Sequence, residues 1–213
     1  GRTHPPGRPR SMNGVRIRLH IDNDRSLGEV FEISEQRLMD TVARQMSELP
    51  AYHAFFGRVA EPALRLADRL VDIAPMPTGK VFFSNSGSEA NESAIKILWL
   101  INWYKDQPEK RKIISRKNAY HGSTVLTASL AGSDYIHHYG LPASEISYTP
   151  MPHYWRYGEA HENEEDYSNR LAQELDELIV ELGPQTVAGF IADPIMSAGG
   201  VIPPPRSYFQ KVQ

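Results

Sequence analysis

Hydrophobic and polar positions change their spacing from one segment of the chain to the next. Apolar residues three or four positions apart are typical of amphipathic helices, whereas short continuous apolar runs are typical of buried strands. The first pattern predicts helices at residues 34–49, 61–73, 88–104, 122–130 and 168–182. The second predicts strands at residues 81–83, 111–115 and 187–192. Alternation at residues 15–19 predicts an edge strand, and residues 133–167 are expected to be mostly loop.

Strands and helices that alternate along a chain predict an α/β fold. In such a fold a mostly parallel sheet is sandwiched by helices, and ligands bind at the carboxyl ends of the strands. The polar turn at residues 84–88 follows one predicted strand, and Asp193 follows another. We therefore expect the turn and Asp193 to share one crevice.

Composition excludes several kinds of partner. The formal net charge of −3 gives no reason to expect nucleic acid or an anionic membrane surface, and no apolar run approaches the ~20 residues of a membrane span. Because the chain has no cysteine, it has no disulfides or thiolate metal sites, and a cytoplasmic location is expected. The adjacent His137 and His138 point in different directions with no carboxylate at ligand spacing, so no metal site is expected.

The polar turn before the third predicted helix is the first candidate site. Ser86, Gly87 and Ser88 lie where a helix N-terminus directs free N–H groups, and the positive end of its dipole, at one point. Such a point favours an anion, most simply a phosphate. The alternative is ordinary capping, in which a serine hydroxyl and Glu89 satisfy the helix end. Spacing alone favours capping.

Three segments resemble class III aminotransferases, which are enzymes dependent on pyridoxal phosphate (PLP). Residues 85–92 are similar to the family's phosphate-binding turn, and residues 118–122 to the segment whose aromatic residue stacks on PLP. Residues 190–205 are similar to a segment with an acid–proline pair followed by Gly-Gly-Val. The three segments have the order and spacing of that family. The resemblance implies the large domain of the PLP-dependent transferase fold type I, in incomplete form.

By this resemblance the cofactor-binding residues are Ser86, Gly87, Ser88, Tyr120, His121 and Asp193. The three turn residues would hold the phosphate. Tyr120 would stack on the electron-poor pyridine ring, and His121 would lie beside it without an assigned acid or base role. Asp193 stands where the family usually has a glutamate near the cofactor, so its reach is shorter than that of the family residue.

Two aromatic segments, residues 52–58 and 152–158, resemble the pyruvate-dependent ω-amino acid aminotransferases. In that family Phe55 and Phe56 would reach across a homodimer interface and line the partner's substrate pocket. Aromatic packing is the alternative for both segments and the preferred interpretation for residues 152–158. The implied reaction transfers an amino group from an ω-amino acid or amine to pyruvate and gives alanine, with PLP as the electron sink.

The resemblance divides the chain in two. Residues 1–43 are interpreted as a divergent N-terminal segment, irregular or part of the small domain, and residues 44–213 as the N-terminal part of the PLP-binding large domain. In the family the Schiff-base lysine lies further downstream, so no catalytic residue is assigned and the chain is expected to be truncated and inactive alone. Alternatives are an inactive homologue that binds phosphate, PLP or a partner protein, and an aminomutase or decarboxylase of the same fold.

Overall fold

The computed structural model describes residues 11–12, 15–21, 27–33, 36–54, 56–75 and 79–213. The chain forms two compact units, Gly1–Val81 and Phe82–Gln213, and each is described by itself. Ser34, the predicted start of the first helix, and Phe55, a predicted substrate-pocket residue, lie outside the described residues. The predicted division after residue 43 stays a prediction.

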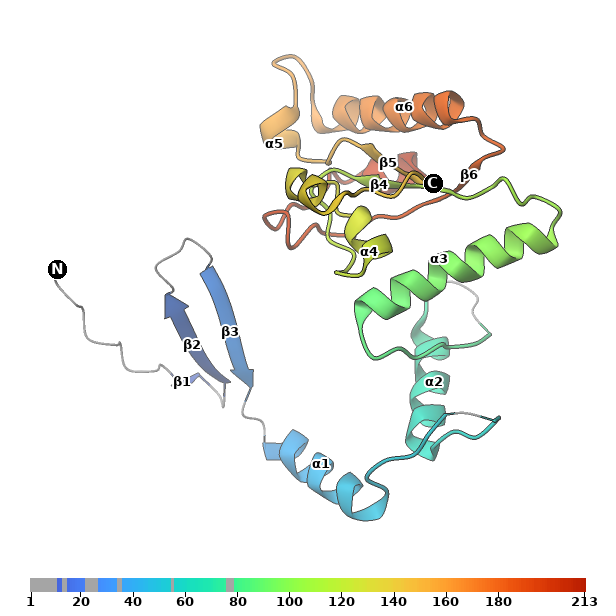
Figure 1. Ribbon diagram of the computed structural model, residues 1–213. Coiled ribbons are helices and arrows are strands. Elements are labelled where there is room, and N and C mark those ends of the chain that lie inside the picture. The colour runs from blue at the N-terminus through green and yellow to red at the C-terminus, as the bar shows by residue number, and fades with distance from the viewer. Residues whose placement is uncertain (1–10, 13–14, 22–26, 34–35, 55, 76–78) are drawn as a thin grey trace. The chain divides into compact units, whose positions relative to one another are not determined.

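The N-terminal unit contains an antiparallel sheet and two helices (Figure 1). Its elements are β1 Ser11–Met12, β2 Val15–Ile21, β3 Leu27–Ile33, α1 Gln36–Glu48 and α2 Glu61–Ile73. Helix α2 has the predicted bounds, with Pro62 in its first turn, where a missing N–H costs nothing. Strand β2 confirms the strand predicted from alternation, whereas β3 lacks a regular alternation and is not predicted by the sequence pattern.

The C-terminal unit is built on a parallel three-stranded sheet in the order β5-β4-β6 (Figure 1). Strand β4 (Lys112–Arg116) is central and pairs with β5 (Ile146–Thr149) on one side and β6 (Val187–Phe190) on the other. A parallel sheet among helices confirms the predicted α/β class.

Helices cover both faces of this sheet. They are α3 Gly87–Tyr104, α4 Val125–Ser129, the 3₁₀ helix η1 Asp134–Tyr139, α5 Tyr154–Tyr157, α6 Glu164–Leu182 and α7 Tyr208–Lys211. Ile113 of β4 packs with Ile95 of α3, whereas Ile114 packs with Leu175 of α6. Successive strand residues point to opposite faces, so these two isoleucines fill two separate cores. Figure 1 shows α6 on one side of the sheet and α4 on the other.

One strand prediction and one loop prediction need correction. Residues 81–83 form neither helix nor strand, and Phe82 and Phe83 are exposed. A strand persists only where a neighbour takes its N–H and C=O groups, and no described strand pairs with this segment. Conversely, β5 lies in the region predicted as loop. Its four residues are too few to show a pattern, and pairing with β4 makes them a strand.

Helix α6 begins at Glu164, earlier than the predicted start at Ser168. The side-chain oxygen of Asn163 accepts hydrogen bonds from the N–H groups of Glu165 and Asp166, each at 2.9 Å. The Asp166 carboxylate accepts from the Asn163 N–H at 3.4 Å, which completes a capping box. Ser168 lies inside the helix and donates its hydroxyl to the Glu164 carbonyl at 2.9 Å.

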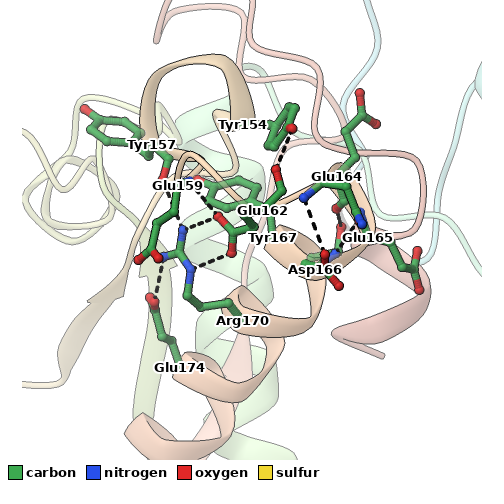
Figure 2. A network of polar contacts seen from close by, with 12 residues as sticks. Tyr154, Tyr157, Glu159, Glu162, Glu164, Glu165, Asp166, Tyr167, Arg170 and Glu174 are labelled. Atoms are coloured by element: carbon green, nitrogen blue, oxygen red, sulfur yellow. Dashed lines mark hydrogen bonds and ion pairs between the residues drawn. The ribbon is translucent and has the colours of Figure 1, made fainter.

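A charged network joins α6 to the loop before it (Figure 2). Arg170 donates to both carboxylate oxygens of Glu162, each at 2.8 Å, and to Glu174 at 3.1 Å. It also donates to the Tyr157 carbonyl at 3.0 Å. The pKa of Glu162 lies below its usual value, chiefly because Arg170 donates hydrogen bonds to its carboxylate. The pKa of Arg170 is raised, chiefly by the same hydrogen bonds to Glu162. Both groups stay charged near neutral pH.

The substitution Ile114→Ala tests the core between the sheet and α6. Ile114 is fully buried, so its truncation leaves a cavity and should lower the free energy of unfolding by about 2–5 kcal/mol. Val180→Ala on the exposed surface of α6 is the matched control, with an expected change below about 0.5 kcal/mol. Urea unfolding followed by circular dichroism measures both variants. Equal losses would contradict the assignment of Ile114 to the core.

Candidate functional site

One pocket of the C-terminal unit contains all six residues predicted to bind the cofactor. Its volume is about 510 Å³, and it lies where the start of α3, the loop after β4 and the loop after β6 meet. The predicted residues that line it are Ser86, Gly87, Ser88, Tyr120, His121 and Asp193. Because β4 and β6 are parallel, their following loops emerge at the same edge of the sheet.

The start of α3 is capped and still has N–H groups to offer. Ser86 is the N-cap, and its hydroxyl accepts from the Glu89 N–H at 3.2 Å. The Glu89 carboxylate in turn accepts from the Asn85 N–H at 2.8 Å. The N–H groups of Gly87 and Ser88 have no acceptor among the described residues. These two amides at the positive end of an 18-residue helix can bind an anion.

Hydrogen bonds attach the loop after β4 to the start of α3. The Ser88 hydroxyl accepts from the Ser123 N–H at 3.0 Å, and the Asn91 side chain donates to the His121 carbonyl at 2.8 Å. Gly122 permits this approach, since its φ is +139° and a Cβ there would lie 2.7 Å from the Ser88 hydroxyl. Ser88 keeps its own hydroxyl hydrogen for another acceptor.

Tyr120 and His121 differ sharply in exposure. Tyr120 is 54% exposed and is one of the residues that line the pocket. His121 is buried, its Nε2 has no hydrogen-bond partner among the described residues, and its Nδ1 lies 3.6 Å from the Asp193 carboxylate. Burial lowers the pKa of His121, and the charge of Arg116 lowers it further, against the opposing effect of Asp193. The imidazole is therefore neutral near pH 7.

Arg116 is the residue of this region that the sequence pattern does not single out. It ends β4 and is fully buried, and its guanidinium donates to the Asp193 carbonyl at 2.5 Å. An arginine that ends an apolar run looks like the polar boundary of a strand. The available signal was its place at the carboxyl end of the central strand, four residues before Tyr120.

The predicted substrate-pocket residue Phe56 belongs to the other unit. It is 96% exposed, with φ at +58°, and its role in a partner's substrate pocket stays a prediction. Within the described part of the chain, no group of three or more His, Cys, Asp or Glu side chains could hold a metal ion. No helix in the same residues is long and apolar enough to cross a membrane.

A sequence model of the family described as Aminotransferase class-III matches residues 34–213. The chain belongs to this family. Among curated class-III relatives, gamma-aminobutyrate transaminase 1, mitochondrial, of rice (Oryza sativa subsp. japonica) is 48% identical over 182 residues. Gamma aminobutyrate transaminase 3, chloroplastic, of tomato (Solanum lycopersicum) is 46% identical over 182 residues. Each match covers 84% of this chain and 35% of the relative.

Solved aminotransferase structures match the fold as well. A PMP-bound aminotransferase from Vibrio fluvialis superimposes with a TM-score of 0.81 at 46% identity. An omega-aminotransferase from Paracoccus denitrificans does so with a TM-score of 0.81 at 44% identity. Each comparison covers 85% of this chain and 40% of the other. The predicted class-III family is thus confirmed, and the chain spans about a third of the length of the curated relatives given above.

His121→Gln tests the buried imidazole. The folded-state pKa of His121 lies below the unfolded value of 6.5, so the unfolded chain takes up this proton first. His121 therefore costs stability as the pH falls below about 6.5. In the variant, the loss of unfolding free energy between about pH 7.5 and about pH 5.5 should shrink, as measured by urea unfolding. His161→Gln, at an exposed position, should leave that loss unchanged, and an unchanged loss in His121→Gln would contradict the prediction.

Proposed function

We propose that this chain forms part of the PLP site of an ω-aminotransferase. The observation that carries the proposal is the pocket lined by the six predicted residues, in which the amides of Gly87 and Ser88 have no acceptor among the described residues. Related solved structures support it, because they include PLP-bound and PMP-bound aminotransferases from Vibrio fluvialis. When bound, PLP supplies an electron sink for carbanion chemistry at the amine carbon.

The residues of the pocket fit such a cofactor. The Gly87 and Ser88 amides and the Ser88 hydroxyl would hold the phosphate at the helix N-terminus. The half-exposed ring of Tyr120 would stack on the flat pyridine ring. His121 would present a neutral, buried nitrogen, and Asp193 would carry the negative charge of the site. Together they provide a phosphate site, an aromatic surface and one carboxylate.

The proposed substrates are an ω-amino acid or amine as donor and pyruvate as acceptor, with alanine as product. Several relatives are named gamma-aminobutyrate transaminases, whose name denotes an ω-amino acid donor. One similar structure is titled as a transaminase with L-ala, which is the amino acid that pyruvate would become. We further propose a homodimer in which Phe55 and Phe56 line the partner's substrate pocket.

One observation favours a second candidate function. No lysine is among the described residues that line the pocket. A chain that binds PLP here without covalent attachment would act as a non-catalytic binding protein. Neither candidate has a described lysine of this chain in the pocket, and the two differ in whether the bound cofactor serves amino-group transfer.

Gly87→Ala tests the phosphate site without disturbing the fold. A Cβ at Gly87 would meet no atom within 4 Å, so the variant should unfold like the wild type. The methyl group would occupy the space that a phosphate needs beside the Gly87 amide. We expect PLP affinity, measured by absorbance titration, to fall about tenfold through the loss of charge-assisted hydrogen bonds.

Gly79→Ala is the matched control, because a Cβ there also meets no atom within 4 Å. It should leave PLP affinity unchanged. Inorganic phosphate should compete with PLP for the wild-type chain, since both need the same amides. Wild-type affinity in Gly87→Ala, or binding that phosphate does not displace, would rule out the proposed phosphate position.

Borohydride reduction after PLP binding tests whether a lysine of this chain attaches the cofactor covalently. Because no described pocket residue is a lysine, we expect peptide mapping of this chain to show no single labelled lysine. Phosphate-competable binding without a specific adduct would support the site as described. A stable adduct on one lysine would show that this chain supplies its own covalent attachment point, against the expectation.

A further inference from the structure

Arg116 is a buried cation without a carboxylate partner among the described residues. Its side chain is fully buried, and its Nε and Nη1 atoms have no hydrogen-bond partner there. Its cation–π neighbours are the rings of Tyr208 and Phe209, with centroids 5.8 and 6.0 Å away. A buried guanidinium is costly unless it is paired or hydrogen-bonded. Its hydrogen bond to the Asp193 carbonyl, at 2.5 Å, is therefore an important contact.

The segment that carries Asp193 has few other attachments. The Ile191 N–H donates to the Ile114 carbonyl, and the Met196 N–H donates to the Ile202 carbonyl. Residues 192–194 lie between these two backbone bonds. Within the described structure, the only hydrogen bond that they make is the one that the Asp193 carbonyl accepts from Arg116. Arg116 thus anchors the backbone at the point where Asp193 turns its carboxylate toward His121.

We propose that Arg116 is a positioning residue of the candidate PLP site, whose guanidinium fixes the Asp193 backbone so that the Asp193 carboxylate faces His121. The part that concerns PLP rests on the proposed function. The part that concerns the placement of Asp193 beside His121 does not depend on PLP, and it is tested without the cofactor. Arg116 does not line the pocket, so it acts through Asp193.

The electrostatics of His121 provide a direct readout of this placement. Two charged groups act on the imidazole: the Asp193 carboxylate, which raises its pKa, and the Arg116 guanidinium, which lowers it. Asp193→Asn removes the first effect and should lower the His121 pKa. The size of that decrease measures how closely Asp193 faces His121, because a charge interaction weakens with distance.

The experiment is a double-mutant cycle followed by NMR titration of His121 in the chain without PLP. Asp193→Asn is made in the wild type and in Arg116→Met, a substitution that keeps an apolar stem of similar length. We expect the decrease caused by Asp193→Asn to shrink by at least about half when Arg116 is absent. A decrease of the same size in both backgrounds would overturn the proposal.

Arg170→Met is the matched control background. It removes another arginine, one that hydrogen-bonds to Glu162 and Glu174 (Figure 2). It therefore serves as a control for a general loss of stability. The full effect of Asp193→Asn should persist there. An equal loss of the effect in Arg170→Met would show that any destabilisation suffices, which would also overturn the proposal.

Arg116→Lys keeps the test decisive if Arg116→Met does not fold. Lysine keeps the charge and an ammonium donor group but lacks the planar fork, so the Asp193→Asn effect should fall below that of the wild type. An effect equal to the wild type in Arg116→Lys would contradict positioning by the guanidinium.

A PLP titration separates this proposal from the proposed function. If the wild type binds PLP, Arg116→Met should bind it about tenfold more weakly, and Arg170→Met should bind it normally. If the wild type does not bind PLP, the proposed function fails, while the NMR cycle still decides whether Arg116 positions Asp193. If the wild type and Arg116→Met bind PLP equally, the cofactor part of this inference fails.

Discussion

The parallel pairing of β4 with β6 is the constraint on which the candidate site depends. Parallel strands end at the same edge of a sheet, so the loop that carries Tyr120 and the loop that carries Asp193 emerge side by side. The same pairing places Arg116, the last residue of β4, within hydrogen-bond distance of the Asp193 carbonyl. Helix α3, packed on this sheet through Ile95, brings the phosphate-binding candidates to the same edge. The packing of the core and the geometry of the candidate site therefore both depend on this sheet.

The edge of the sheet carries polar groups that the fold does not fully satisfy. His121 has a buried nitrogen without a described partner, and Arg116 has two. Such groups cost stability in a protein interior, and perturbed groups of this kind concentrate at functional sites. The Arg170 network shows the opposite arrangement, because the Arg170 guanidinium donates to two carboxylates and to one carbonyl. The two arginines therefore differ in how fully the described residues satisfy their donors.

Local signals predicted most helices, because caps and prolines act within a few residues. Helix α2 has its predicted bounds, and α3 begins one residue from its predicted start. Pairing was harder to predict. Residues 81–83 have the composition of a strand but lack a partner, and β5 is a strand through its pairing with β4. The six candidate site residues were predicted together by resemblance. Arg116 was missed because its hydrogen-bond acceptor, the Asp193 carbonyl, lies 77 residues away in the sequence.

From the sequence, capping and anion binding at the start of α3 are alternative interpretations. In the structure the two are compatible, because they use different N–H groups. Ser86 and Glu89 satisfy the N–H groups of Glu89 and Asn85. The amides of Gly87 and Ser88 lie between them and have no acceptor in the described structure. A helix has four unsatisfied N–H groups at its start, so a cap that uses one leaves others for a ligand. The Ser86 cap thus fixes the helix start whose remaining amides can bind a phosphate.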